Sequence, residues 1–573
     1  MERCIFGVDL NPLAVELAKL SLWISTVAKD RPLSFLDHHL RLGNSLIGAW
    51  VRDLGMLPLR GKKDKRQKDA KIMVGGLFEG KLKERLPVVL GEVMELLRKP
   101  SDKVEDIREK EAIYDRILAI LNPFKEVANA WVSTYFGNDV DEADYENALV
   151  KLSDPSPVWE REVRTQAWFA KAQEIVAARH FFHWELEFPE VFFEETGQRK
   201  RNPGFDAVIG NPPYDVLATK EIGDAVVAEL DYFKTMYKLV LGKANLYRLM
   251  VERSYQLLRS NGASFGFIVP TTLLADWSAT PLRQLVLQES AVRAVLVFPE
   301  SARVFEGVTQ SVTILVTRSG QPATEVPIAG NAGDRDELGS TGTVSIPVDT
   351  IKTISPKEWR IPVATPPTLK LLQKLHQNET FQRTAAGSTY QGEVNLTVHR
   401  GHISYEPTTT RLIRGDHISR YSLHHPCDVP RLDWLRRTDY LRAMRASEKA
   451  AHHMRPRIVV QRVANMELDR RLNACVIEPC DFTSDMTNYI LPGRFGMLSL
   501  LALLNSKLLN WRFKLTSTNN YISAEEINSL PIRRIAFTTP PAERARLVDE
   551  AKRLYRVALE RAEETYPVPA RRG

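Results

Sequence analysis

Short apolar runs alternate with amphipathic stretches at the start of the chain and again over residues 205–317. Apolar residues in the longer stretches recur at three- and four-residue spacing, which is typical of helices that bury one face. Strands that alternate with helices predict a mostly parallel sheet covered on both faces. We therefore expect an α/β fold with a doubly wound, Rossmann-like sheet. Its expected strands beyond residue 200 are 205–210, 262–270, 292–298 and 312–317.

The first apolar run ends at Asp9 and passes into an amphipathic helix. Asn11 is expected to cap this helix, because Pro12 suits its first turn. The carboxyl end of a parallel strand is where α/β proteins bind ligands, and an acidic side chain there can accept both hydroxyls of a ribose. Helping to cap the helix is the simpler alternative role for Asp9. The apolar stripe of the helix consists of Leu13, Leu17, Leu20 and Ile24.

The run 205–210 is followed by Asn211, Pro212, Pro213 and Tyr214. Consecutive prolines end a strand, because each lacks an N–H group and fixes φ. The side-chain oxygen of Asn211 and the carbonyl of Pro212 offer two acceptors to the exocyclic amine of a base, and Tyr214 offers a flat face for its ring. Holding both N–H groups exposes the nitrogen lone pair for attack on an electrophilic methyl group. The alternative is that the tetrapeptide is only a tight turn.

This turn, at the end of such a strand, resembles the catalytic motif of gamma-class N6-adenine DNA methyltransferases. That family occurs in restriction-modification and phage-defence systems, and in the methylase part of single-chain type IIG enzymes. The resemblance implies S-adenosylmethionine as cofactor. It also implies that Phe305, in the loop before the last expected strand, stacks on the second face of a flipped adenine. Anchoring that loop is the alternative role for Phe305.

Two N-terminal segments resemble the cofactor motifs of the same family. The sequence V-D-L-N-P, which contains Asp9 and Leu10, is similar to the motif whose acidic residue holds the ribose of the cofactor. The sequence L-R-L-G-N-S-L, which contains Asn44 and Ser45, is similar to the motif that meets the adenine of the cofactor. The resemblance therefore implies that these four residues bind S-adenosylmethionine.

The glycine-rich first motif of the family is missing. It belongs upstream of the acidic strand, and only eight residues precede Asp9. Gly75 and Gly76 lie in a stretch expected to be a basic linker, so they lack the strand-turn-helix setting of such a loop. We expect the first strand of the sheet to be absent, a partner polypeptide to supply it, and the chain alone to bind the cofactor weakly. A truncated start and a degenerate relic are the alternatives.

Beyond residue 350 the composition shifts toward β-like segments with interspersed arginines. Arg457, Gln461 and Arg462 lie on one expected strand, and Arg and Gln side chains read base edges through paired hydrogen bonds. A helix expected over 498–509 and the turn 517–522 resemble the target-recognition domains of restriction-modification specificity modules. These features imply double-stranded DNA as a partner.

The expected organisation has five parts. They are the cofactor part of a methyltransferase core at 1–50, a helical insert at 51–180, the catalytic part of the core at 181–350, an α+β target-recognition domain at 351–535 and a C-terminal helix at 536–573. The insert begins with a basic run at 60–68, whose simplest role is a solvated loop.

Composition narrows the class of protein. Hydrophobic residues make up 44% of the chain and charged residues 26%, which is ordinary for a globular protein, and the net charge is +7. The four cysteines include no C-x-x-C pair, so no metal site is expected. No apolar run approaches the ~20 residues of a membrane span. We therefore expect a cytoplasmic protein without a membrane partner.

Together these motifs predict a site-specific DNA adenine-N6 methyltransferase subunit. The alternative is a DNA-recognition or assembly subunit that no longer methylates. The missing glycines favour this alternative, and the intact N-P-P-Y sequence disfavours it. A nuclease in the same chain is not expected, because no convincing pair of carboxylates with a lysine at metal-binding spacing is found.

Overall fold

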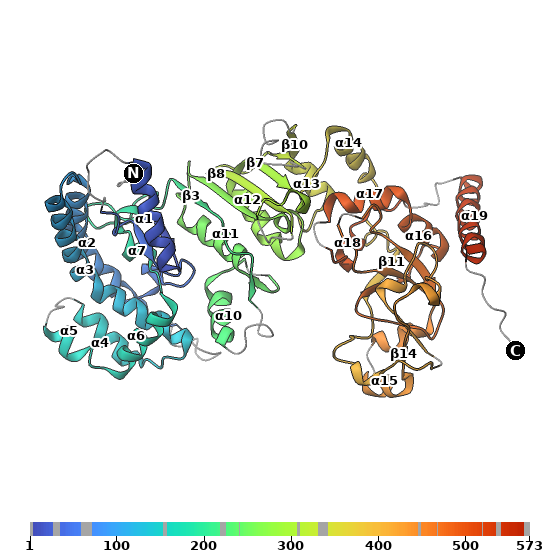
Figure 1. Ribbon diagram of the computed structural model, residues 1–573, viewed down its shortest axis with the longest axis horizontal. Helices are drawn as coiled ribbons and strands as arrows, with labels where there is room; N and C mark the ends of the chain where they lie inside the picture. Colours follow the sequence, from blue (N-terminus) through green and yellow to red (C-terminus); the bar gives the residue numbers. More distant parts are fainter. Residues whose placement is uncertain are drawn as a thin grey trace. The chain divides into compact units, whose positions relative to one another are not determined.

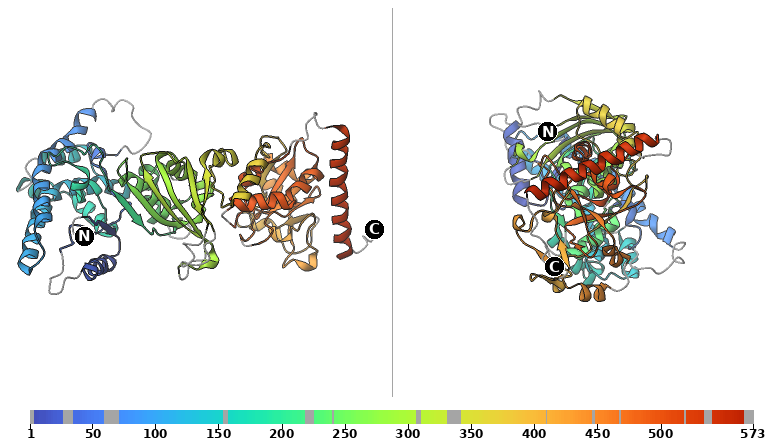
Figure 2. Two further views of the ribbon diagram at one scale, coloured as in Figure 1. Left: turned by 90° about the horizontal axis from the view of Figure 1, so that it is seen from above. Right: turned by 90° about the vertical axis from the view of Figure 1, so that its right-hand side faces the viewer.

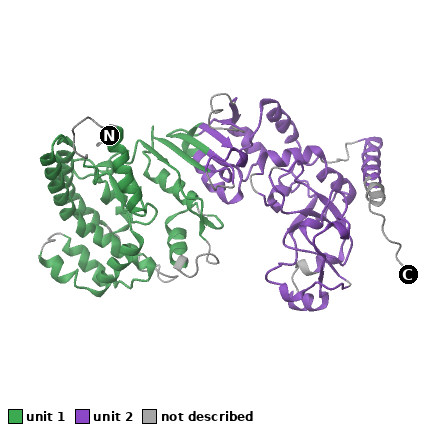
Figure 3. Ribbon diagram, in the orientation of Figure 1, with its two compact units in different colours: residues 1–269, 288–293, 314–322 green, residues 270–287, 294–313, 323–573 purple. Residues whose placement is uncertain are grey.

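The computed structural model describes most of the chain. The described residues are 4–26, 35–58, 71–152, 157–217, 225–239, 241–305, 310–330, 342–408, 410–444, 448–466, 468–517, 520–533 and 540–565. They form two compact units (Figure 3), each described by itself. The first unit consists of residues 1–269, 288–293 and 314–322, and the second of residues 270–287, 294–313 and 323–573. The five-part organisation stays a prediction.

The largest sheet has six strands in the order β10-β9-β7-β8-β6-β3. β3 runs parallel to β6 and β7 parallel to β9, whereas β9 and β10 are antiparallel. The strands are β3 (Ala207–Gly210), β6 (Ser264–Pro270), β7 (Ser290–Phe298), β8 (Val312–Ser319), β9 (Glu325–Ala329) and β10 (Val344–Pro347). Helices α11 (Leu246–Leu257) and α12 (Thr280–Glu289) alternate with them (Figure 1). The expected α/β class is confirmed, with a strand at each of the four expected positions.

The N-terminal segment forms a separate parallel pair, β1 (Gly7–Asp9) and β2 (Leu40–Leu42), joined through α1 (Pro12–Thr26). The Leu13 N–H donates to Asn11 Oδ1 at 2.9 Å, so the expected cap is confirmed. Among the described residues, the sheet pairing leaves one edge of β1 and one edge of β3 without a neighbouring strand.

The apolar stripe of α1 lies on the solvent side. The other face of α1, which carries Val15, is also apolar. This face packs on the β1–β2 pair, where Val15 is buried against Leu36 and Leu40. An amphipathic helix ordinarily buries its apolar stripe, so the opposite arrangement here is a departure. The exposed fractions of the stripe are 64% for Leu13, 52% for Leu17, 42% for Leu20 and 59% for Ile24.

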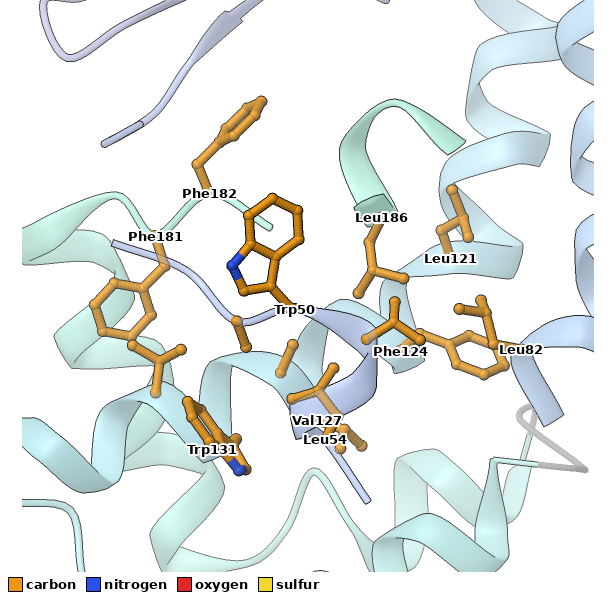
Figure 4. Packing of buried hydrophobic residues seen from close by; sticks show 14 of the residues in the cluster. Trp50, Leu54, Leu82, Leu121, Phe124, Val127, Trp131, Phe181, Phe182 and Leu186 are labelled. Carbon is orange, nitrogen blue, oxygen red and sulfur yellow. The ribbon is translucent and has the colours of Figure 1, made fainter. Parts of the chain in front are cut away.

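A helical region follows and builds the main core of the first unit. Its helices are α2 (Lys71–Arg98), α3 (Val104–Ser133), α4 (Glu142–Lys151), α5 (Pro157–Glu162) and α6 (Ala167–Arg179). Figure 4 shows Leu82, Phe124 and Trp131 of these helices packed with Trp50 and Phe182 from the flanking segments. The placement of Gly75 and Gly76 in a linker was wrong, since both lie in α2, while the basic run 60–68 lies outside the described residues.

One ionic cluster ties this helical region to the β1–β2 segment. Glu187, at the end of α7 (Trp184–Glu187), accepts from Arg41 Nη1 on β2 at 2.8 Å and from Lys125 Nζ on α3 at 2.8 Å. Burial alone would raise the pKa of the Glu187 carboxyl, but the charges of Lys125 and Arg41 outweigh it and lower that pKa to about 2. The three groups thus hold two sequence-distant segments together.

The second half carries two four-stranded sheets. Their strands are β11 (Gly387–Gln391), β18 (Thr487–Pro492), β15 (Arg457–Gln461) and β16 (Ala474–Ile477), then β12 (Ile403–Ser404), β14 (Asp433–Leu435), β13 (Arg411–Ile413) and β17 (Phe482–Thr483). The helices are α15 (Arg437–Met444), α16 (Met497–Leu504), α17 (Lys507–Thr516), α18 (Ala524–Asn528) and α19 (Pro541–Thr565). The single helix expected over 498–509 was wrong, because the Leu509 N–H donates to Ser506 Oγ at 3.1 Å and α17 starts anew there.

The remaining elements are short connections. They are α7, α8 (Pro189–Phe192), β4 (Val216–Leu217), α10 (Ala225–Met236), β5 (Ala244–Asn245), α13 (Val348–Ile354) and α14 (Pro366–Leu375). Figure 2 gives two further views of the elements. Within the part of the chain that the structure describes, no helix has both the length and the apolar composition needed to cross a membrane.

Candidate functional site

The tetrapeptide that follows β3 leaves its carboxamide accessible. Asn211 and Pro213 are exposed, Pro212 is buried and Tyr214 is half-buried. The Tyr214 hydroxyl can donate to the backbone carbonyl of Ile268 at 3.3 Å, at the end of β6, and to Asn211 Oδ1 at 3.4 Å. Both distances are long, and they place the phenol beside the acceptor oxygen of Asn211. The Asn211 carboxamide is therefore open to a ligand and has an aromatic ring next to it.

The end of β3 also depends on a close approach to β6. Gly210 lies opposite Phe267 in the parallel register, and a Cβ added to Gly210 would come within 2.9 Å of the Phe267 ring. The Phe267 ring in turn stacks on Phe265 with centroids 4.6 Å apart. Glycine at the last position of β3 thus lets an aromatic ring pack against the start of the Asn-Pro-Pro-Tyr turn.

The expected cofactor residues meet at one edge of the β1–β2 pair. Asp9 and Leu10 are exposed, and the Asn11 N–H donates to Asp9 Oδ1 at 2.7 Å. The Gly43 N–H donates to the Asp9 carbonyl at 2.9 Å, which brings Asn44 to the same edge. Asp9 does help to form the turn, as the alternative role required, and its carboxylate remains exposed for a ligand.

Asn44 and Ser45 are fixed by the segments around them. Asn44 is half-buried, and its Oδ1 accepts from the Leu46 N–H at 3.1 Å. The Ser45 carbonyl accepts from Trp184 Nε1 at 3.0 Å, and Ser45 Oγ lies 3.4 Å from Met250 Sδ on α11. The carboxamide nitrogen of Asn44 is the group that can still donate to a purine ring. The residues present therefore suit the adenosine part of S-adenosylmethionine.

Phe305 is half-buried in the segment between β7 and β8. It belongs to the second unit and Tyr214 to the first. Its stacking on a flipped base stays a prediction.

The expected base-reading residues do not share one environment. Arg457 has an exposed fraction of 0%, pairs with Glu393 and lies over the Tyr489 ring at 5.1 Å. Its assignment to DNA recognition was wrong. Arg457 is the first residue of β15 and points into the core, where the carboxylate of Glu393 balances the charge of its guanidinium. Gln461 Oε1 accepts from Asn473 Nδ2 at 3.1 Å.

Arg462 lies nearer the surface than Arg457. It is half-buried, and its Nη1 donates to the Asp485 carbonyl at 2.6 Å. Its guanidinium also lies 5.8 Å from the centroid of the Tyr521 ring, which is 49% exposed. A role of Gln461 and Arg462 in DNA recognition stays a prediction.

The open edges of β1 and β3 belong to the same unit and start close together. Phe6, directly before β1, and Phe205, two residues before β3, have ring centroids 5.5 Å apart. Ile209 on β3 is 84% exposed, an unusual exposure for an apolar side chain on a strand of a parallel sheet. The first unit thus has two unpaired strand edges, an exposed apolar stripe on α1 and an exposed Ile209 among the described residues.

The sequence matches the Eco57I restriction-modification methylase family over residues 3–305. It is 23% identical over 354 residues to a protein of Methanocaldococcus jannaschii described as a type II restriction enzyme and methyltransferase, a match that covers 56% of this chain and 26% of that protein. It is 32% identical over 114 residues to the type II restriction enzyme and methyltransferase RM.Eco57I of Escherichia coli, covering 20% of this chain and 11% of that protein.

A solved structure is also similar. The type IIL restriction-modification enzyme MmeI in complex with DNA is 12% identical with a TM-score of 0.39, and the match covers 98% of this chain and 84% of that chain. The matches to the M. jannaschii and E. coli proteins span only 26% and 11% of the length of those relatives.

Proposed function

The chain belongs to the Eco57I restriction-modification methylase family, and on this basis we propose that it is a DNA adenine-N6 methyltransferase subunit. Its substrate is one adenine, flipped out of double-stranded DNA in the cytoplasm. The single observation that carries the proposal is the exposed Asn211 carboxamide beside the Tyr214 ring at the carboxyl end of β3.

The chemistry of this turn suits an exocyclic amine. The two amine N–H groups donate to Asn211 Oδ1 and to the Pro212 carbonyl, and the base stacks on Tyr214. The family resemblance alone suggests Phe305 for the second face of the base. Holding both N–H groups moves the nitrogen toward a tetrahedral shape and directs its lone pair at the methyl group. The nitrogen would then form one N–C bond as the bond between the methyl group and the donor sulfur breaks, so that a neutral thioether leaves and one proton is released to solvent. No strong base is needed before the attack, since the nitrogen attacks as the neutral amine.

Asp9 and Asn44 hold the cofactor in this proposal, Asp9 through the ribose hydroxyls and Asn44 through the adenine edge, with Leu10 and Ser45 beside them. When bound, S-adenosylmethionine supplies an electrophilic methyl group on a sulfonium. Support comes from the exposed Asp9 carboxylate and from the bond between the Gly43 N–H and the Asp9 carbonyl, which brings Asp9 and Asn44 to one edge.

We further propose that a strand-turn-helix segment of a partner polypeptide completes this cofactor site. Its strand would pair with the open edges of β1 and β3, and its helix would cover the stripe of α1 and Ile209. Support comes from the exposed stripe and from the adjacent starts of the two strands, marked by Phe6 and Phe205. Exposed strand edges beside a large apolar surface are typical of sites where another chain docks.

Calorimetric titration of the purified chain with S-adenosylmethionine tests the partner proposal. The expected result is weak binding, because the backbone that would hold the methionine end is not among the described residues. Tight binding by the chain alone would refute the need for a partner. If the assembled protein binds cofactor and DNA yet transfers no methyl group, the alternative of an assembly subunit is favoured instead.

Tyr214→Ala in the assembled protein is expected to lower turnover about 5- to 100-fold, since base–aromatic stacking contributes about 1–3 kcal/mol. Tyr214→Phe is the matched control, because it keeps the ring and removes only the long bonds to Asn211 and Ile268, so it should stay within about threefold. Single-turnover methylation measures both variants. Unchanged turnover in Tyr214→Ala would exclude the ring from the stack.

Arg462→Ala is expected to relax the choice of sequence at one base pair, at a cost of about 1–3 kcal/mol in discrimination. Arg462→Lys keeps the charge but cannot form the paired bonds, so it should relax the choice in a similar way. Sequencing of the methylated sites measures the preference. If Arg462→Ala methylates the same sites as the parent protein, Arg462 does not read a base and only donates a hydrogen bond to the Asp485 carbonyl.

A further inference from the structure

A cleft of about 760 Å³ lies in the second unit, and its lining residues include none of residues 211–214. One wall comes from the carboxyl ends of β6 and β7, with Thr272 and Glu300, and the other from α17, with Trp511 and Lys514. The carboxyl edge of a parallel sheet is where α/β proteins bind ligands. Binding sites for small molecules have volumes of about 300–1,000 Å³.

The charges of the cleft disfavour a phosphate group. Glu300 and Asp469 are its acidic lining residues, and Lys514 is its basic one. The Lys514 Nζ donates to the Leu468 carbonyl at 2.8 Å, so this ammonium is already engaged. Phosphate contacts in nucleic-acid complexes come chiefly from accessible cations. The cleft therefore suits an uncharged group.

Its neutral polar groups suit the edge of a flat heterocycle. Ser517 is only 4% exposed, and its Oγ has no hydrogen-bond partner among the described residues although it lines the cleft. A buried hydroxyl without a partner is costly and marks a place where a ligand can bond. Asn520 Oδ1 accepts from the Met466 N–H at 2.9 Å, which leaves the amide nitrogen as the group that can donate to a ligand.

Trp511 supplies the stacking surface. Its indole is half-buried on α17 and lines the cleft beside Asn520 and Ser517. An indole face can stack on a nucleobase, and a hydroxyl and a carboxamide beside it can form hydrogen bonds with the edge of that base. The turn 517–522, which contains Ser517 and Asn520, was the sequence signal for this place, but the sequence did not single out Trp511.

We propose that this cleft binds a nucleobase of the DNA substrate other than the target adenine, with Trp511 stacking on the base and Ser517 and Asn520 contacting its edge. The proposal rests on the proposed function, because it assumes that DNA is the substrate. The proposal assigns sequence discrimination to Trp511, Ser517 and Asn520, in place of the role that Arg457 was expected to have.

The first test uses the assembled protein and an unmethylated duplex that contains the sequence the protein methylates. Trp511→Ala is expected to lower the affinity for this duplex about 5- to 100-fold, and Trp511→Phe to stay within about threefold. Affinity for a duplex without the site should be the same for all three proteins, because that binding depends on phosphate contacts. Equal affinities of Trp511→Ala and the parent for the duplex that contains the site would overturn the proposal.

The second test separates direct contact from a structural effect. Duplexes with an abasic position at each step of the site in turn are bound to the parent protein and to Trp511→Ala. At one abasic position, the loss of affinity caused by the missing base and the loss caused by Trp511→Ala should not add, because both changes remove the same contact. Additive losses at every position would mean that Trp511 acts on the fold and would overturn the proposal.

Asn520→Asp gives an independent readout at that position. It keeps the acceptor for the Met466 N–H and exchanges the ligand-facing donor for an acceptor, so the preferred base should change there and nowhere else. An unchanged preference would remove Asn520 from the contact. If the parent protein binds no DNA, the proposed function itself fails; if it methylates DNA while the losses add everywhere, only this inference fails.

Discussion

Replacing Asn211 by Ala is expected to reduce methyl transfer about 10²- to 10³-fold while leaving DNA affinity within about twofold of the parent. Removing one preorganised polar group that contacts the reacting centre typically costs this much in turnover. The side chain is exposed, so its loss should not disturb the fold. Single-turnover transfer of a labelled methyl group, together with equilibrium DNA binding, measures both effects on the assembled protein.

Asn211→Asp is the matched control for this variant. It keeps an acceptor oxygen where the amine would bind and removes only the amide nitrogen. It should therefore retain more transfer than Asn211→Ala. A parallel loss of DNA binding and transfer in Asn211→Ala would mean that Asn211 holds the turn in shape instead of holding the amine.

Replacing Glu187 by Gln is expected to destabilise the first unit by about 3 kcal/mol, because the change leaves two largely but not fully buried cations without their counter-charge. Arg41 and Lys125 both donate to this carboxylate at 2.8 Å. Thermal unfolding followed by circular dichroism measures the loss. Glu174→Gln is the control, since Glu174 pairs with Lys171 at an exposed site, where such a pair contributes less than about 1 kcal/mol.

The difference in unfolding free energy between the parent protein and Glu187→Gln should depend on pH. The pKa of Glu187 is lowered to about 2 in the fold, whereas an unfolded Glu has a pKa of about 4.3. The carboxylate therefore contributes its full stabilisation above about pH 4.5, and this contribution is lost as the pH falls toward about 2. The difference in stability between the parent and Glu187→Gln should shrink over that range. A constant difference would mean that the charge is not the stabilising feature.

Local chemistry made part of this structure predictable. The two prolines after residue 210 predicted where β3 ends, and Asn11 before Pro12 predicted the cap of α1, because both depend on a few neighbouring residues. The sequence predicted that Asp9 follows a strand and named Asn44 through its resemblance to a cofactor motif; the parallel pairing of β1 and β2 then brings both residues to one edge.

Other features depended on three-dimensional packing that the sequence does not carry. Arg457 begins a strand whose other residues are apolar, and nothing local shows that Glu393, 64 positions away, would neutralise it in the core. The stripe of α1 has the periodicity of a buried face, yet the fold places Val15 inward instead. Nothing in the sequence around Trp511 distinguishes its indole from a core aromatic, because the wall of the cleft opposite α17 comes from residues about 200 positions earlier.

The most direct measurement is the identity of the modified base. Duplex DNA is incubated with the assembled protein and S-adenosylmethionine that carries a deuterated methyl group, then digested to nucleosides for mass spectrometry. The expected product is deuterated N6-methyladenine from the parent protein and almost none from Asn211→Ala. Deuterated methyl groups on cytosine, or equal amounts of N6-methyladenine from both proteins, would contradict the claim that Asn211 and its neighbours hold the amine of an adenine.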